Sequence, residues 1–491
     1  MRKLLLATAA MLGATVGATG LAVAAPPFTN QGTVATPASM GSFTYGDNNY
    51  MSGTPTKGPV ANPTPGTMVI RLGLMMQVGM GAAWSNLDKS STQKLSPVLI
   101  QEYVRLYPGV DAMAANGLRY GAAVEIRQNY ASAAGAEPLT NGGTVYTSTQ
   151  TLYVRRAFGY VGGNWGIIRL GEMDGLIGTY DEGGATTGVY LSPTGTIVGG
   201  NAQALNVGNA WMIPYFAAQS GNEYGNAKIV YLSPSFHGFD FGLEYAPNPF
   251  NGYAIGGGYL PGATGIAALG TCTSAAGSGC PNVSSSSTPL SGSISQNEYS
   301  VGVRYQGQLG PAAVLAYGVY VGSGHTNYTG TAAAAVAAAG APPGSTYTGK
   351  FQDLSLGMFG ANVNVANFAV FGNVMFGKFN GILGLTPDGA PNATGFGVGF
   401  KYIYGPYSIG AVYSQFDSQG AYQLVGLTQR HEWVLAAAAT YYAAPGLIFS
   451  LDYDYGQRYQ GGYNFMTGAV GSGAYNHVRA QGVLAQFMVK Y

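Results

Sequence analysis

The feature that most constrains the fold is a two-residue alternation of apolar and polar side chains, which is clearest at the end of the chain. Within 483–491 every odd position is apolar, while Gln486 and Lys490 lie at even positions. Successive side chains of a β-strand point to opposite faces, so this segment predicts a strand with one apolar and one mixed face. Such a strand is typical of the wall of a β-barrel that stands in lipid.

The same alternation recurs from Thr67 to Tyr491, in about sixteen segments. In 118–126, for example, the even positions are apolar, and Arg119 and Glu125 occupy odd positions. An even number of strands lets an up-and-down barrel close on itself. We therefore predict an all-β fold, a transmembrane up-and-down antiparallel β-barrel.

The connections between these segments alternate in length, which distinguishes the pattern from that of a soluble β-sandwich. The short connections fall at 162–165, 233–238, 307–311, 364–367, 405–406 and 443–446. The long connections fall at about 83–98, 131–147, 173–222, 248–295, 323–349, 379–393, 417–429 and 458–476. Short turns at one rim and long loops at the other are typical of an outer-membrane barrel. A barrel of this strand number is too wide for side chains to fill, so it should enclose water.

The N-terminal end has the pattern of a secretory signal. Arg2 and Lys3 precede a short apolar stretch at 4–16, and the small residues Ala22 and Ala24 match a cleavage site. An anchoring helix is the alternative, but the apolar stretch is short and rich in glycine and alanine. We expect a signal peptide at 1–24, a flexible N-terminal segment at 25–66 and the barrel at 67–491.

The composition argues against a soluble enzyme. Only 8% of the residues are charged and the formal net charge is +1, which also argues against a nucleic-acid partner. The 78 glycines and 36 tyrosines suit thin strands and a lipid–water boundary. The sequence has neither a Gly-x-Ser-x-Gly elbow nor a phosphate-binding loop, and His431-Glu432 lacks the second histidine of a zinc helix. We expect no enzymatic activity, no cofactor and no metal.

Two cysteines, Cys272 and Cys280, lie close together in a stretch rich in glycine and serine. In an exported chain we expect them to form a local disulfide that closes a loop. A zinc site is the weaker alternative, because two thiols without a neighbouring histidine do not complete a set of four ligands.

Arginines gather on the first five segments of the predicted barrel. Parity places six of them on the inner face, whereas it places Arg156 on the outer face. A lipid-facing arginine near the bilayer midplane costs roughly 2–4 kcal/mol, so an inward cluster is favoured. The cluster is either a solvated wall or one half of an electric field across the lumen. Its members are Arg71, Arg105, Arg119, Arg127, Arg155 and Arg169.

Acidic residues follow directly, at the end of the fifth segment and in the connection after it. If this connection folds into the lumen, its carboxylates would face the guanidinium groups, and the resulting field would discriminate among ions. An exposed extracellular loop is the alternative. With the six arginines, these acids are our candidate pore constriction: Glu172, Asp174, Asp181 and Glu182.

The segment from Arg155 to Gly171 resembles the fourth and fifth strands of the Gram-negative general porins. In that family an Arg-x-Ala-Phe strand turns through a Gly/Asn tip into a strand that ends in Leu-Gly. The resemblance implies a trimer of sixteen-stranded barrels in the outer membrane, surrounded by lipid and lipopolysaccharide. It also implies an inward-folded third loop whose acids oppose a wall of arginines. On this basis Arg155 matches a wall arginine, and Asp181 and Glu182 match the acidic loop tip.

We therefore expect a water-filled channel for the passive diffusion of small hydrophilic solutes and ions across the outer membrane of a Gram-negative bacterium. One alternative is a channel specific for a sugar or an anion, and another is an adhesive or structural barrel with long binding loops. Lys228 and Lys401 are isolated at inward positions rather than arranged as an anion ladder. Four tyrosines that parity places inward also form no continuous run: Tyr103, Tyr107, Tyr153 and Tyr320.

Overall fold

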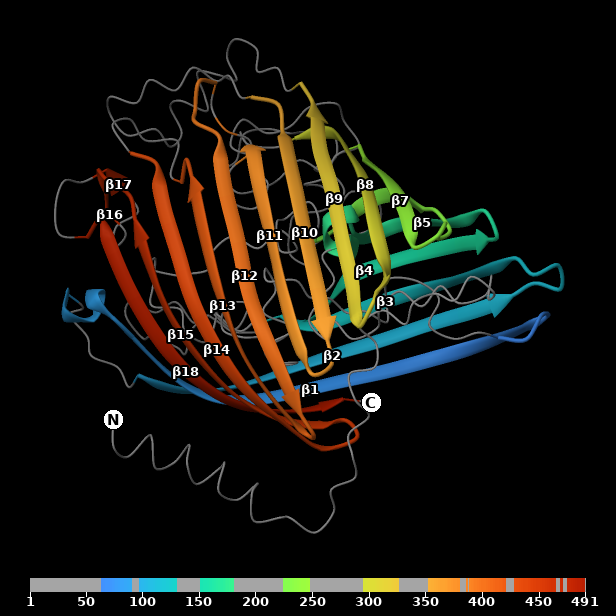
Figure 1. The fold of residues 1–491 in the computed structure, drawn as a ribbon, viewed down its shortest axis with the longest axis horizontal. Coiled ribbons are helices and arrows are strands. Elements are labelled where there is room, and N and C mark those ends of the chain that lie inside the picture. The colour runs from blue at the N-terminus through green and yellow to red at the C-terminus, as the bar shows by residue number, and fades with distance from the viewer. Residues whose placement is uncertain are drawn as a thin grey trace, which may run out of the picture.

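Sixteen strands hydrogen-bond to one another in a closed antiparallel barrel in the computed structural model of the chain (Figure 1). This architecture confirms the predicted fold class and strand number. None of the described helices is long and apolar enough to cross a membrane. The structure describes residues 63–90, 97–129, 151–180, 224–247, 295–325, 352–379, 386, 388–420, 428–464, 469–470 and 475–490.

Strands that follow one another in the sequence pair along the barrel, and β18 returns to pair with β1. The first eight strands are β1 (Thr67–Ser85), β2 (Val98–Met113), β3 (Arg119–Asn129), β4 (Thr151–Gly163), β5 (Gly166–Asp174), β6 (Tyr224–Leu232), β7 (Phe239–Ala246) and β8 (Gln296–Leu309). The other eight are β9 (Ala312–Gly324), β10 (Ser355–Val365), β11 (Phe368–Lys378), β12 (Ala393–Tyr404), β13 (Tyr407–Ser418), β14 (Arg430–Ala444), β15 (Leu447–Tyr459) and β18 (His477–Lys490). The remaining described elements are the 3-10 helix η2 (Asn86–Ser90), the helix α2 (Leu176–Tyr180) and a small ribbon of β16 (Tyr463–Asn464) and β17 (Ala469–Val470).

Side-chain burial alternates along the strands with a period of two, as the sequence predicts. Along β7, Phe239 and Leu243 are exposed on the outer face, and Asp240 and Glu244 are buried on the inner face. A charged inner face and an apolar outer face suit a barrel that stands in lipid.

The short and long connections also alternate as predicted, so the short turns share one rim. The tightest of them need glycine: Gly405 and Gly446 have φ angles of 54° and 76°, a left-handed conformation that glycine adopts without steric cost. At the opposite rim, the described start of the long connection after β5 is α2.

The barrel closes where β18 pairs with β1, from Met75 opposite Lys490 to Ser85 opposite Ala480. Inward polar side chains cross this seam. Gln77 of β1 donates a hydrogen bond to Gln486 of β18, and Gln486 donates to Asp452 of β15 over 2.8 Å. All three side chains are buried, so a hydrogen-bonded chain on the inner face ties the first strand to the last two.

A β-bulge in β4 overturns one parity assignment. Glu125 of β3 pairs with Arg156, but the next residue, Ile126, pairs with Val154. Arg155 is therefore the extra residue of the bulge, and the parity of β4 reverses there. Arg156, which simple alternation places on the outer face, is 1% exposed on the inner face.

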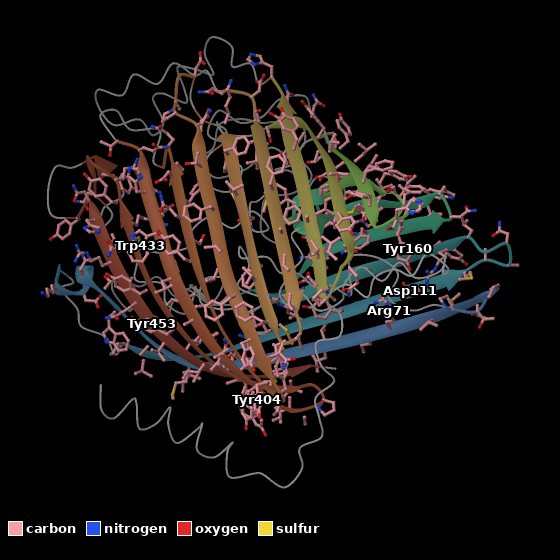
Figure 2. The ribbon with its side chains drawn as sticks, in the orientation of Figure 1. Arg71, Asp111, Tyr160, Tyr404, Trp433 and Tyr453 are labelled. Carbon is pink, nitrogen blue, oxygen red and sulfur yellow. The ribbon has the colours of Figure 1, made fainter. Side chains whose placement is uncertain are left out.

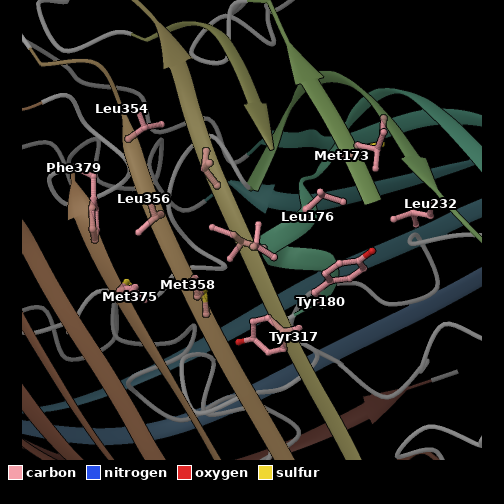
Figure 3. Close-up of a cluster of buried hydrophobic side chains, with 14 of the residues drawn as sticks. Met173, Leu176, Tyr180, Leu232, Tyr317, Leu354, Leu356, Met358, Met375 and Phe379 are labelled. Carbon is pink, nitrogen blue, oxygen red and sulfur yellow. The ribbon is translucent and has the colours of Figure 1, made fainter. Parts of the chain in front are cut away.

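Inside the barrel, α2 packs against the inner wall. Its residues are buried and contact β5, β7, β8 and β9. Leu176, Ile177 and Tyr180 join an apolar cluster that extends to Tyr317 of β9 and Met358 of β10 (Figure 3). The start of the third long connection therefore lies within the barrel.

Candidate functional site

The inner wall of the barrel is the candidate site, and on β1, β2 and β4 it is polar. Arg71 and Asp111 form an ion pair, with 2.5 Å between Nε and Oδ2, and the hydroxyl of Tyr160 donates a hydrogen bond to the other carboxylate oxygen. Figure 2 shows the three side chains together on the β1–β2 side of the barrel. Two inward glycines leave the necessary space, since a Cβ at Gly109 would lie 2.6 Å from the Arg71 guanidinium and one at Gly121 would lie 2.4 Å from the Tyr160 hydroxyl.

A second charged group connects β2, β3, β4 and the end of β5. Glu125 lies between Arg105 and Arg156, at 4.0 Å and 3.3 Å from their nearest nitrogens. Arg156 also reaches Asp174, with 2.8 Å between Nη2 and Oδ2. All four side chains are at least nine-tenths buried, so each charge depends on its neighbours rather than on bulk water.

A third group fixes α2 to the wall of β6 and β7. Glu244 accepts a hydrogen bond from the backbone N–H of Leu176 over 2.8 Å, and Lys228 pairs with the same carboxylate at 2.8 Å. The N–H groups in the first turn of a helix have no partner within the helix, so this contact positions the first turn of α2.

β5 and β8 hold the other end of α2. Arg304 pairs with Asp240 at 3.0 Å, and its guanidinium lies 4.8 Å from the ring centre of Tyr180. Arg169 donates a hydrogen bond to Thr179 over 3.1 Å. The first residues of the third connection are therefore attached to the wall at both of their ends.

The inner wall of β9–β14 is different because its buried side chains are mostly apolar. Figure 3 shows part of this surface, which faces α2 and extends along β10 and β11. Lys401 of β12 is an exception, since it is buried on the inner face. The apolar inward residues include Val319, Val321, Leu356, Met358, Phe371, Met375, Val412, Phe416, Val434 and Ala436.

The structure places five of the ten predicted constriction residues on this wall. Arg71, Arg105, Arg119 and Arg169 lie on the inner face, and Asp174 joins them through Arg156. For Arg127 and Arg155 only the backbone positions are described. The remaining predictions lie outside the described residues: Asp181, Glu182, Cys272, Cys280 and the regions 1–24 and 25–62.

Besides Arg156, two further sequence predictions are wrong, one for an acid of the third connection and one for the parity of a tyrosine. Glu172 shares the outer face with the exposed Leu170 and lies half-buried opposite Ala157 and Ala227, so it is not part of the inner wall. Tyr320 is 43% exposed on the outer face, where its hydroxyl lies 3.2 Å from that of Ser355. Alternation from the inward Arg169 already places Glu172 on the outer face, because β5 continues to Asp174 and includes it. For Tyr320 the strand boundary is uncertain in the sequence, and one residue of shift moves a side chain to the other face.

The sequence interpretation missed the acids that neutralise the wall arginines. Asp111 lies at the same parity as Arg105, and Glu125 at the same parity as Arg119, so period two contains the signal for both. Asp240 and Glu244 carry the same signal on β7. Among the described residues, no group of three or more histidine, cysteine or acidic side chains could hold a metal ion.

Comparison with known proteins yields a family match and several similar structures. The family model described as Gram-negative porin matches residues 74–461. An anion-selective porin from Comamonas acidovorans is 13% identical, with 87% of this chain and 100% of that chain covered and a TM-score of 0.48. OmpF of Salmonella typhi in complex with daunomycin is 15% identical, with 84% and 97% covered and a TM-score of 0.48. The trimer form of OmpT from Vibrio cholerae is 11% identical, with 86% and 99% covered and a TM-score of 0.45. No protein with curated function matches the sequence.

Proposed function

Since this chain belongs to the Gram-negative porin family and forms an outer-membrane channel for passive diffusion, we propose that the channel serves small hydrophilic solutes and ions in general rather than one solute. The observation that carries the proposal is the side-by-side pairing of opposite charges on the inner face of β1–β8, as in Arg71–Asp111 and Arg304–Asp240. Paired fixed charges orient dipolar solutes without imposing a single sign along the whole path.

The inward lysines and tyrosines favour the general channel over a specific one. A channel for one anion needs a ladder of cations, but Lys228 is paired with Glu244 and Lys401 lies apart on β12. A sugar channel needs a slide of aromatic rings, and of the candidate tyrosines Tyr320 lies outside and Tyr107 is buried inside. In the part of the wall that the structure describes, the lysines form no ladder, these tyrosines form no slide, and five of the inward cations are paired with acids.

We further propose that the channel works as a homotrimer, in a membrane of lipid and lipopolysaccharide. The outer faces of the strands support it, because they differ around the barrel. From β6 to β18 the outer face carries neighbouring aromatic rings, such as Tyr413 and Trp433 at 6.0 Å between centres, which suit a lipid–water boundary. Figure 2 shows Tyr404, Trp433 and Tyr453 on that side. On β1–β5 the exposed side chains are mainly apolar and few of them are aromatic. Interfaces between identical subunits have an apolar core, so this face suits contact with a second copy: Met68, Ile70, Leu72, Ile100, Leu152, Val154, Ile168 and Leu170.

Asp181 and Glu182 complete the constriction in this proposal, facing Arg71, Arg119, Arg127 and Arg155. The support is positional, because α2 ends at Tyr180 inside the barrel and these acids follow directly. The need for counter-charge is a weaker argument, since Asp111, Glu125 and Asp174 already neutralise part of the arginine wall. The loop acids would therefore adjust ion selectivity rather than hold the wall together.

Conductance of the purified protein in a planar lipid bilayer tests the proposal. We expect stepwise ohmic conductance in which channels close in groups of three equal steps, one for each subunit. We expect no saturable block of the current by a single sugar or anion. Changing Asp181→Asn and Glu182→Gln together should move the reversal potential in a salt gradient toward anions, and Arg119→Gln should move it the other way. Folded protein without conductance would contradict the channel, and block by one solute at low millimolar concentration would favour a specific channel. If the Asp181→Asn, Glu182→Gln variant keeps the wild-type reversal potential and conductance, those two acids lie outside the constriction.

A further inference from the structure

The outer face of β13, β14, β15 and β18 changes its chemistry from one rim of the barrel to the other. The register of these four strands places their outward residues in rows, with one residue from each strand. The two rows in the middle of the strands are aliphatic apart from Tyr453. The row nearest the short turns is wholly aromatic: Tyr407, Tyr441, Phe449 and Phe487.

The three rows nearest the long connections are polar and aromatic, and Leu435 is the one aliphatic residue among them. At about 3.3 Å of rise per residue and 4.8 Å between strands, they cover roughly 13 Å by 14 Å. Figure 2 shows Trp433 toward this rim and Tyr404 at the opposite rim. We call these rows the upper patch, and from the rim inward they are Asp417, His431, Tyr459 and His477, then Gln415, Trp433, Gln457 and Arg479, then Tyr413, Leu435, Tyr455 and Gln481.

Side chains within the upper patch hold one another in place. Gln415 accepts a hydrogen bond from the Tyr413 hydroxyl over 3.1 Å and donates one to Asp417 over 3.0 Å. On β15, Gln457 donates to the Tyr455 hydroxyl over 2.9 Å. The amides and rings are therefore oriented before any ligand arrives, which lowers the entropy lost on binding.

Two donors of the upper patch have hydrogen-bonding capacity left. Arg479 is exposed, and its guanidinium makes no hydrogen bond or ion pair with a described residue. Gln481 accepts a hydrogen bond from Tyr453 over 3.1 Å, and its amide nitrogen makes none with a described residue. The backbone N–H of Arg479 donates to the side chain of Asn86 over 2.8 Å, so η2 fixes this edge of the patch.

Free donors on an outer face are costly against hydrocarbon, because nothing there accepts a hydrogen bond. The aromatic row at the other rim shows that a lipid–water boundary needs rings alone. The upper patch adds donors to its rings, since Arg479 and Gln481 lie beside Trp433 and Tyr455, whose ring centres are 5.5 Å apart. Flat apolar rings suit the C–H faces of a sugar, amides suit its hydroxyl groups, and a guanidinium binds phosphate through two hydrogen bonds.

We infer that the upper patch binds the phosphorylated sugar headgroup of a lipid in the outer leaflet of the membrane. The long connections mark the outer rim of such a barrel, so the patch faces that leaflet. Charge complementarity supports this occupant, because Arg479 is free for a phosphate, whereas Asp417, the one acid of the patch, is hydrogen-bonded to His431. A second copy of the chain is the other candidate, but the face proposed for it on β1–β5 is apolar. The inference rests on the proposed membrane of lipid and lipopolysaccharide, and it assigns the surface that recognises the headgroup.

Native mass spectrometry of the purified full-length protein in detergent micelles tests this assignment. The probes are diphosphoryl lipid A, a phosphorylated disaccharide lipid, and phosphatidylglycerol, which has a phosphate but no sugar. The wild-type protein should bind lipid A more tightly than phosphatidylglycerol. Arg479→Gln should weaken lipid A binding by about tenfold, as expected for loss of a hydrogen bond to a charged group. Trp433→Leu should weaken binding of lipid A and not of phosphatidylglycerol, because it removes a ring face and leaves Arg479 in place.

Two matched controls lie outside the upper patch. Lys378→Gln removes an exposed cation from the outer face at the end of β11, at the same rim. Tyr441→Leu removes a ring from the aromatic row at the opposite rim. Both variants should bind lipid A as the wild-type protein does, and the urea midpoint of every variant shows whether the barrel is intact.

Three results would overturn the inference. The first is wild-type affinity for lipid A in both Arg479→Gln and Trp433→Leu, and the second is equal binding of lipid A and phosphatidylglycerol by the wild-type protein. The third is a loss of subunits from the complex with no change in lipid binding, which would make the patch a contact between copies. Lipid binding in micelles needs no conduction, so a protein that binds lipid A but conducts no ions would contradict the proposed channel and leave this surface assigned.

Discussion

On β1–β8 the buried inward side chains are held by ion pairs, such as that of Arg156 with Asp174, whereas on β9–β14 they are held by apolar contacts, such as those around Leu356 and Met358. Five cations of the first half have an acid within 4.0 Å: Arg71, Arg105, Arg156, Lys228 and Arg304. The apolar side chains that dominate the second half depend on volume and shape, although Lys401 and Glu432 are buried there as well. One closed sheet therefore carries two kinds of interior, and a substitution in each half should fail for a different reason.

The helix α2 shows how the two halves are joined. Its first N–H group binds the Glu244 carboxylate and its last residue, Tyr180, stacks on Arg304, so its attachment to β7 and β8 is electrostatic. The side chains of Leu176 and Ile177 join the apolar cluster that continues along β9 and β10. Because the third connection starts here, both halves fix the position of its first residues.

The largest effect should come from breaking one ion pair in the charged half. Glu244→Ala leaves Lys228 buried without this carboxylate and removes the acceptor for the Leu176 N–H. Losing one partner of a buried pair costs about 3–5 kcal/mol of unfolding free energy. Urea unfolding of the barrel in detergent micelles measures this loss.

Two variants sharpen this result. Replacing the pair together, Lys228→Met with Glu244→Leu, should cost much less, because no unpaired charge remains. Glu172→Ala is the matched control on the outer face, where no ion pair is present in the described structure, and it should change stability by less than about 1 kcal/mol. A loss at Glu172 equal to that at Glu244 would contradict the distinction between the two faces.

A cavity in the apolar half should have the next largest effect. Leu356 is fully buried in the cluster, so Leu356→Ala removes contacts and leaves a void. Large-to-small changes of this kind cost about 2–5 kcal/mol. The same urea titration applies, and Val363→Ala on the outer face of β10, where Val363 is 37% exposed, is the control. If Leu356→Ala and Val363→Ala unfolded at the same urea concentration, the inner face of β9–β14 would not be a packed core.

The sequence predicted the regular part of this molecule well. Period-two alternation and unequal connections are local signals, and they are strong enough to find sixteen strands and their order. The bulge at Arg155 was not predictable from alternation, because one extra residue reverses parity without changing composition. The charged wall was half predicted, since Asp111 and Glu125 share the parity of the arginines, but they pair with arginines of other strands, which alternation along one strand does not reveal.

The apolar inner face of β9–β14 could not be predicted from alternation, for a physical reason. Alternation identifies a face only when the two faces differ in polarity, and on β10 Leu356 and Met358 face inward while Phe359 and Val363 face outward. Both faces are then apolar, as they are in strands buried on both sides. What covers the inner face depends on residues distant in the sequence, and α2 is one such covering element.

The smallest of the three effects on stability, and the most informative one for the channel, should come from the space that α2 occupies. Gly302 of β8 faces inward, and a Cβ there would lie 2.8 Å from the ring of Tyr180 and 3.2 Å from Val319. Gly302→Ala should therefore push α2 away from the wall at a cost of about 1–3 kcal/mol, the usual penalty for overpacking. Because α2 begins the third connection, the same methyl group should also change single-channel conductance.

Gly159→Ala on the outer face of β4 is the control, since its Cβ would meet only a backbone oxygen at 3.7 Å. A wild-type conductance in Gly302→Ala, together with the expected loss of stability, would show that α2 packs against the wall without setting the width of the lumen.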